Sequence, residues 1–336
     1  MKLEILVSIN ISVTMKSLTP LRLLHTSSPL RHVTPSASTS RLFHTTSRIL
    51  SHENPLGLPQ KGVPPKFSRG LPQKRPIPQV SHILAISSAK GGVGKSTIAA
   101  NLSLAFTRLG YSTGLLDTDL YGPSVPTLFN LTGHQPSLTP AGALVPLTNY
   151  GTKTMSIGYL SPSEDNPIVW RGPMLLKAIQ QLLHSVSWGP PQLDVLVLDL
   201  PPGTGDIQLS ITQQIPLSGA VVVTTPHTLA IKDAIKGVNM FEKVDVPVLG
   251  LIQNMSTFCC PNCNAETAVF GGNEGVKKMC AEKGLEILGD VPLHPNIGED
   301  GSRGKPTVVA EPNSARAKVF MDVARKLADK IGLASQ

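Results

Sequence analysis

The chain has 336 residues, of which 40% are apolar and only 4% aromatic, and its formal charge is +8. No stretch reaches 18 consecutive apolar residues, so the sequence predicts no transmembrane helix. Residues 1–50 carry six Lys or Arg and one Glu, which leaves +3 for the rest of the chain. Because the rest is nearly neutral, we expect one α/β domain with a basic tail and no nucleic-acid partner.

The N-terminal 50 residues are rich in Ser, Thr, Arg and Leu and nearly free of acid, which is typical of a mitochondrial transit peptide. The run RLFHTTSRIL at 41–50 resembles the two-step processing pattern of matrix proteins and predicts a mature N-terminus at Ser51. The alternatives are a tail without a targeting role and a start at Met15. Residues 51–80 contain seven prolines and predict an extended linker, which leaves 81–336 for the folded domain.

Short apolar runs then alternate with helical spacing along the chain. The runs fit strands buried on both faces of a sheet, at 83–87, 114–116, 195–198, 220–224, 248–252 and 287–291. One predicted helix begins at Ser96 and stops at Gly110, a second covers 231–241, and Ser314 caps a last helix that reaches Ile331. This alternation predicts an α/β fold with a mostly parallel sheet, helices on both faces, and ligands at the carboxyl ends of the strands.

A glycine-rich loop joins the first predicted strand to the first predicted helix. Its glycines allow the backbone N–H groups to turn inward at a helix N-terminus, where the helix dipole favours anions. Lys95 would reach the β- and γ-phosphates, and Ser96 would place its hydroxyl on Mg²⁺. Ala89 departs from the first glycine of the usual pattern, whereas the adjoining KGGVGKST is itself specific. The sequence therefore predicts that ATP is bound by Ala89, Lys90, Gly91, Gly92, Val93, Gly94, Lys95, Ser96 and Thr97.

Acidic residues follow two more of the predicted strands. In LLDTD at 115–119, Asp119 is the candidate for orienting the attacking water, with Asp117 close by. In VLVLD at 195–199, Asp199 stands where a Walker B acid would hold Mg²⁺ and its waters. The loop PPGTGD at 201–206 would sense the γ-phosphate. The alternative role for an acid at a strand end is helix capping.

The second lysine of the loop, Lys90, resembles the signature lysine of the partitioning-ATPase and nitrogenase-iron-protein class. In that class the lysine reaches into the nucleotide site of the other subunit, so the resemblance implies a nucleotide-sandwich homodimer in which Lys90 and Lys95 both serve hydrolysis. Asn254 resembles the adenine-contacting asparagine of the same class. The alternative for Lys90 is a solvated loop side chain.

The four cysteines are confined to one region of the chain and comprise Cys259, Cys260, Cys263 and Cys280. Such clustering is typical of a metal site or a redox pair rather than a disulfide framework. Cys260 and Cys263 supply two thiolates, whereas a tetrahedral site or a cubane cluster usually takes four. A symmetric dimer would supply four by pairing the two motifs across its axis. Alternatives are a redox pair, a structural Zn²⁺ site and buried cysteines; Cys259 is interpreted as a bystander.

Several motifs together resemble the Mrp/Nbp group of iron–sulfur carrier ATPases. They are NMSTFCCPNC at 254–263, FGG at 270–272, DLYGPS at 119–124, WRGPM at 170–174 and DLPPGTGD at 199–206. The likeness runs from Ile83 to Ile331. With the N-terminal segment added, the chain most resembles the mitochondrial Ind-type branch, whose members assist the assembly of respiratory complex I.

This resemblance implies a carrier that uses ATP and Mg²⁺ and holds a labile [4Fe–4S] cluster between two subunits, on Cys260 and Cys263 of each. It also implies a mitochondrial matrix location, slow ATP hydrolysis subordinate to the carrier role, and apo iron–sulfur clients that include complex I subunits. Two alternatives share the glycine-rich loop. A positioning ATPase of the ParA/MinD class has no need of the cysteine pair, and an electron donor like the nitrogenase iron protein differs in cysteine spacing.

Overall fold

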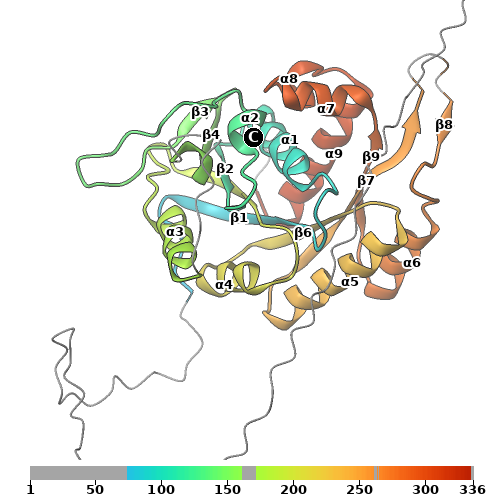
Figure 1. Ribbon diagram of the computed structural model, residues 1–336, viewed down its shortest axis with the longest axis horizontal. Helices are drawn as coiled ribbons and strands as arrows, with labels where there is room; N and C mark the ends of the chain where they lie inside the picture. The colour runs from blue at the N-terminus through green and yellow to red at the C-terminus, as the bar shows by residue number, and fades with distance from the viewer. Residues whose placement is uncertain (1–73, 161–171, 261–262, 264, 334–336) are drawn as a thin grey trace, which may run out of the picture. The chain divides into compact units, whose positions relative to one another are not determined.

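The computed structural model describes residues 74–160, 172–260, 263 and 265–333 (Figure 1). The predicted transit peptide, most of the predicted linker, and Trp170, Arg171, Pro261 and Asn262 of the quoted motifs lie outside these residues. Within the described part, the segment predicted as a linker over 51–80 reaches the core at its end. Ile77 is buried there, and the Arg75 backbone N donates to the Gln214 oxygen.

Strands and helices alternate along the described chain. The strands are β1 (Val80–Ser87), β2 (Thr113–Asp117), β3 (Leu147–Asn149), β4 (Thr152–Ser156), β5 (Leu193–Asp199), β6 (Gly219–Thr224), β7 (Val248–Cys259), β8 (Glu266–Thr267) and β9 (Ile287–Leu293). The helices are α1 (Lys95–Arg108), α2 (Val125–Leu128), α3 (Gly172–His184), α4 (Asp206–Gln214), α5 (Thr228–Lys243), α6 (Glu274–Lys283), α7 (Pro295–Ser302), α8 (Thr307–Ala310) and α9 (Ala315–Lys330), with a 3₁₀ turn at Ile157–Tyr159.

The strands form one sheet that is parallel except at its margins. Strands β4, β2, β5, β1, β6, β7 and β9 lie side by side in that order and run parallel. Strand β3 pairs antiparallel with β4, and β8 pairs antiparallel with the last residues of β7. This arrangement confirms the predicted α/β class with a mostly parallel sheet.

Helices cover both faces of the sheet (Figure 1). Helices α1 and α9 pack together on one face, and α5 and α6 lie on the other. The central strands are apolar and buried because helices cover both of their faces. Among the described residues, no helix is long and apolar enough to cross a membrane.

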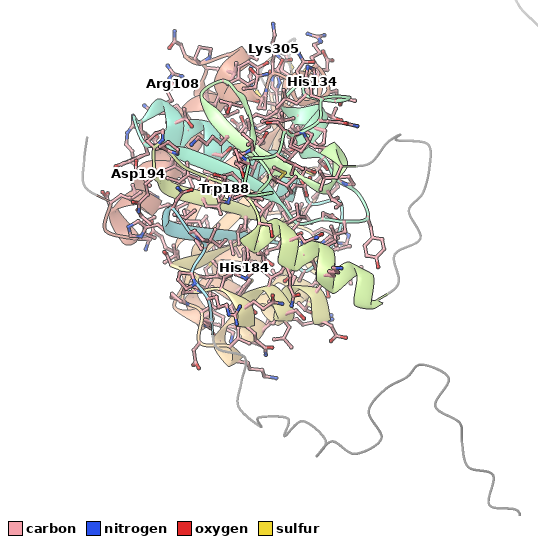
Figure 2. All side chains as sticks on the ribbon, turned by 90° about the vertical axis from the view of Figure 1, so that its left-hand side faces the viewer. Arg108, His134, His184, Trp188, Asp194 and Lys305 are labelled. Carbon is pink, nitrogen blue, oxygen red and sulfur yellow. The ribbon has the colours of Figure 1, made fainter. Side chains whose placement is uncertain are left out.

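The segment after α3 closes the core near β2. Figure 2 shows His184 at the end of α3 and Trp188 beyond it. Trp188 is fully buried, and its ring occupies the space left by the missing side chain of Gly114, since a Cβ at Gly114 would lie 3.0 Å from the indole. The Lys153 ammonium donates to the Trp188 carbonyl oxygen over 2.5 Å, which ties this segment to β4.

Most of the predicted strands and helices are present in the structure, although their ends differ by a few residues. Helix α1 begins at Lys95 rather than Ser96, and the Ser314 hydroxyl caps α9 by accepting from the Ala317 backbone N. The main correction concerns β7, which continues past the predicted end at Ile252 to Cys259. Asn254 therefore lies within the strand rather than after it.

Candidate functional site

The glycine-rich loop connects the end of β1 to the start of α1 at the carboxyl edge of the sheet. Gly94 is left-handed, with φ of 83°, and a Cβ on it would lie 2.2 Å from Asn254 Nδ2. Only glycine satisfies both conditions. Lys90 lies half-buried at the outer turn of the loop, where its carbonyl oxygen accepts from the Ser88 hydroxyl. The loop therefore has the strand–loop–helix context that the sequence predicts for phosphate binding.

Two of the predicted site residues form a buried ion pair. Lys95 Nζ lies 2.5 Å from Asp199 Oδ1 and 3.3 Å from the Ser96 hydroxyl. Burial raises the pKa of Asp199, and the Lys95 ammonium opposes that rise. The other carboxylate oxygen of Asp199 is buried and has no hydrogen-bond partner among the described residues. An unpartnered carboxylate oxygen beside a hydroxyl fits Mg²⁺ or one of its waters.

Asp117 has a larger part in the site than the sequence indicated, because it holds several neighbouring groups in place. It is fully buried, and its carboxylate accepts from four donors: the backbone N of Asp119, Ser124 and Val125, and the Ser156 hydroxyl. Burial raises its pKa to about 7, with the Asp199 charge adding to the rise and Lys95 opposing it. Asp117 therefore fixes the loop that carries Asp119.

The predicted water-orienting residue, Asp119, lies on that loop and is partly exposed. Its Oδ1 accepts from the backbone N of Tyr121 and Gly122, each over 3.3 Å. Its negative charge also raises the pKa of Asp199, so the two carboxylates share one electrostatic environment. The structure thus places Asp119 close enough to Asp199 for their charges to interact, and its part in hydrolysis stays a prediction.

Gln208 is a site residue that the sequence analysis missed. Its side-chain oxygen accepts from the Ser87 hydroxyl over 3.2 Å, and its amide nitrogen donates to the Pro201 carbonyl. The Gly203 backbone N also donates to the Ser88 oxygen over 3.0 Å. These contacts join the loop at 201–206 to the base of the phosphate loop. A lone glutamine just after the loop at 201–206 gives no signal of such a role in the sequence.

Asn254 connects β7 to the phosphate loop. It is nearly buried, and its side-chain Nδ2 donates to the Val93 oxygen over 2.8 Å. Asn254 also lines a cavity of about 350 Å³ together with Gly94, Thr97 and Phe258, and residues at the start of α7 complete the lining. A largely apolar cavity of this size beside the loop suits a nucleotide base. The geometry is compatible with the predicted adenine contact, which stays a prediction.

The cysteine pair lies at the turn of a β-hairpin formed by β7 and β8. Cys259 pairs with Glu266 across the hairpin, and the Cys260 backbone N donates to the Ala265 oxygen over 3.0 Å. Cys260 is half-buried and Cys263 is exposed. In Figure 1 this hairpin extends away from the body of the sheet. Cys280, by contrast, is buried in α6, where burial raises the pKa of its thiol.

Comparison with known proteins places the chain in a family. Residues 79–328 match the family described as "NUBPL iron-transfer P-loop NTPase". The chain is 50% identical over 267 residues to the mouse (Mus musculus) iron-sulfur cluster transfer protein NUBPL, covering 79% of this chain and 82% of the mouse protein. It is 46% identical over 249 residues to the Arabidopsis thaliana "Iron-sulfur protein required for NADH dehydrogenase, mitochondrial", covering 74% and 78% of the two chains.

Solved structures share the fold. A nucleotide-binding protein from Archaeoglobus fulgidus in complex with ADP superposes with a TM-score of 0.60 at 31% identity, covering 72% of this chain and 93% of that chain. The cell division ATPase MinD of Pyrococcus furiosus has a TM-score of 0.54 at 20% identity, covering 74% and 98%. The second likeness concerns the fold alone. The match over residues 79–328 and the identity to the mouse and Arabidopsis proteins show that this chain belongs to the NUBPL iron-transfer P-loop NTPase family.

Proposed function

We propose that this protein is an ATP-dependent carrier that receives an iron–sulfur cluster on Cys260 and Cys263 and passes it to apo-proteins. One observation carries the proposal: the cysteine hairpin is the end of β7, the same strand whose Asn254 holds the phosphate loop. The proposed nucleotide site would thus lie along β7, and the two cysteines follow directly after the end of the same strand. The names of the mouse and Arabidopsis relatives support iron–sulfur transfer as the use of this arrangement.

The chain's own residues supply an ATP and Mg²⁺ site. The backbone of the loop from Ala89 to Gly94 would face the phosphates, and Lys95 would exchange its Asp199 partner for them. Ser96 and the unpartnered oxygen of Asp199 would hold Mg²⁺, which supplies charge neutralisation on the phosphates. Asp119 would orient water. With Lys90 acting in the other subunit, hydrolysis would be slow and would follow dimer formation.

The cluster itself is the cargo. Two thiolates from one chain make half of the ligand set for a [4Fe–4S] cluster, so the proposed carrier is a homodimer with a bridging cluster. Exposed apolar side chains of the described residues support this. Tyr121 follows β2 and Leu229 follows β6, while Val269 and Phe270 follow β8 of the cysteine hairpin. A second copy would cover them.

Delivery is proposed to occur in the mitochondrial matrix, with complex I subunits among the clients. The basic, acid-poor composition of residues 1–50 and the word "mitochondrial" in the name of the Arabidopsis relative support a mitochondrial location. Import into isolated mitochondria followed by N-terminal sequencing should give a product that begins near Ser51. A full-length chain left outside the organelle would exclude this part of the proposal.

The carrier role is tested by anaerobic reconstitution with iron and sulfide, absorption spectroscopy and iron counting per dimer. Wild-type protein should hold about four iron atoms per dimer, as a bridging cubane requires. Cys260→Ala and Cys263→Ala should each lose the cluster and keep ATP binding. Cys280→Ala is the matched control and should keep both. Three results would contradict the proposal: four iron atoms per monomer, zinc in place of the cluster, or a cluster that persists when Cys260→Ala and Cys263→Ala are combined.

A further inference from the structure

Phe258 belongs to two parts of the molecule at once. Its side chain lines the cavity of about 350 Å³ beside the phosphate loop, with Gly94, Thr97 and Asn254. Its backbone belongs to the cysteine hairpin, because Phe258 pairs with Thr267 of β8 one residue before Cys259. No other residue of the described hairpin pairs, Phe258–Thr267 and Cys259–Glu266, lines that cavity. A ligand in the cavity would therefore touch the base of the hairpin directly.

Strand β7 is irregular immediately before Phe258. Met255 adopts a left-handed backbone, with φ of 54°, which a non-glycine residue seldom takes. The pairing of β7 with β9 also shifts register between Asn254 and Phe258. Such bulges break the ladder, bend the strand and re-aim its side chains. Strand β7 therefore consists of a part paired with β9 up to Asn254 and a part from Phe258 that pairs with β8 and, in a shifted register, with Leu293 of β9. The irregular backbone at Met255 lies between the two parts.

We propose that Phe258 contacts the base of the bound nucleotide and is the positioning residue through which occupancy of the base cavity sets the position of the Cys260–Cys263 hairpin. The inference rests on the proposed nucleotide site and deepens it by naming the residue that links the two sites. The aromatic face of Phe258 would stack on a purine, and the irregular backbone at Met255 would let the hairpin follow the ring.

The hairpin would move as a unit because three successive contacts join its two strands. They are the Phe258–Thr267 pair, the Cys259–Glu266 pair and, next to the turn, the hydrogen bond from the Cys260 backbone N to the Ala265 oxygen. On the remaining side Phe258 pairs with Leu293, the last residue of β9. A displacement of the Phe258 ring is thereby passed to Cys260 through two residues of hydrogen-bonded backbone rather than through a loose loop.

The test uses cluster-free full-length protein, so its outcome does not depend on cluster binding. The probe is ADP, which lacks the γ-phosphate that a sandwich dimer would share. Three quantities are measured. The first is the ADP affinity; the other two, the hydrogen exchange of segment 256–267 and the alkylation rate of Cys263, are each compared with and without saturating ADP. The variants are Phe258→Ala and, as matched control, Ile297→Ala, because Ile297 of α7 lines the same cavity from outside β7.

Both variants should bind ADP about tenfold more weakly, within the range for lost base contacts. In wild type and Ile297→Ala, saturating ADP should change exchange and alkylation at the hairpin at least about fivefold, the lower end of usual coupling between sites. In Phe258→Ala the change should vanish at saturation. Phe258→Tyr should restore it. An undiminished response in Phe258→Ala, or no response in wild type, overturns the inference, whereas failure of ADP to bind wild type at all overturns the proposed nucleotide site instead.

Discussion

Lys95 is a buried ammonium that already has an anionic partner. Nucleotide phosphates would compete with Asp199 for it, so ATP binding and the release of Asp199 for Mg²⁺ become one exchange of partners. The sequence assigns Lys95 and Asp199 to phosphate and metal separately. Their 2.5 Å contact shows how the two assignments are joined before any ligand arrives.

Removing this ammonium should weaken ATP binding by about 10- to 100-fold, the value of a charged hydrogen-bonded contact. We expect this for Lys95→Ala in titration calorimetry. Lys90→Ala is the matched control in the same loop and should bind ATP normally while phosphate release falls, because its target lies across the dimer. Normal hydrolysis by Lys90→Ala would contradict the sandwich arrangement.

The carboxyl of Asp117 makes stability depend on pH. Its pKa is about 7 in the folded protein, against an ordinary value of 3.8. Between these values the folded state holds a proton that the unfolded state has lost, so raising the pH lowers the free energy of unfolding. Between the two pKa values the free energy of unfolding falls by at most about 1.4 kcal/mol per pH unit, and the loss is complete above about pH 7.

Asp117→Asn cannot titrate, so its free energy of unfolding should fall less steeply from pH 4 to 7 than that of wild type. Urea unfolding of the nucleotide-free protein in Mg²⁺-free buffer measures the slopes. Asp322→Asn is a control, since Asp322 pairs with Arg325 on the surface of α9. Parallel curves for wild type and Asp117→Asn would show that Asp117 does not titrate in this window. The absolute stability of the variant is a separate matter, because Asn accepts fewer hydrogen bonds.

At the scale of elements, the spacing of apolar residues in the sequence locates the buried strands and those helices that carry a clear stripe of apolar residues. It underestimates β7, because Gln253, Asn254 and Ser256 interrupt the apolar run while lying buried in the sheet. Their place is set by pairing with β9 and by the Asn254 bond to Val93, both of which join residues distant in sequence. Strands β3, β4 and β8 were not predicted either. They are short and lie at or next to an edge of the sheet, where strand formation depends on the neighbouring strands.

The same limit applies to the site. Residues in a local motif, such as Lys95, Ser96 and Asp199, could be identified from spacing alone. Gln208 and Phe258 could not, because each gains its role only when a distant segment packs beside it. The central place of Asp117 likewise follows from donors at Ser124 and Ser156 that no spacing rule connects.

The turn from β1 into α1 gives a matched pair of glycine substitutions. Gly94→Ala should lower the free energy of unfolding by about 1–3 kcal/mol and abolish ATP binding, because the left-handed backbone and the Asn254 amide both oppose a Cβ. Gly91→Ala meets no atom within 4 Å and should change stability by less than about 0.5 kcal/mol. Chemical unfolding and nucleotide titration compare the two. Equal effects would mean that loop flexibility, rather than close approach to β7, governs this turn.

At the scale of the whole molecule, the exposed apolar residues fall into separable groups. Val269 and Phe270 follow the cysteine hairpin and are 54% and 37% exposed. Leu138 is 64% exposed but lies in the loop before β3, at the other edge of the sheet. A bridging cluster would bring the hairpins of two copies together. Val269 and Phe270 would then be covered by the second copy, while Leu138 would stay in solvent.

This difference predicts how the dimer responds to substitution. Val269→Ser combined with Phe270→Ser should weaken the cluster-loaded dimer by about 1 kcal/mol for each side chain covered, because only its exposed part remains to be buried. Leu138→Ser should leave it unchanged. Sedimentation of the reconstituted proteins across a range of concentrations gives the dissociation constants, and iron analysis of the same samples shows whether the cysteines still hold the cluster. If Leu138→Ser weakened the dimer and the double substitution did not, the two copies would meet at the β3 edge. Cys260 and Cys263 could not then share one cluster across the axis.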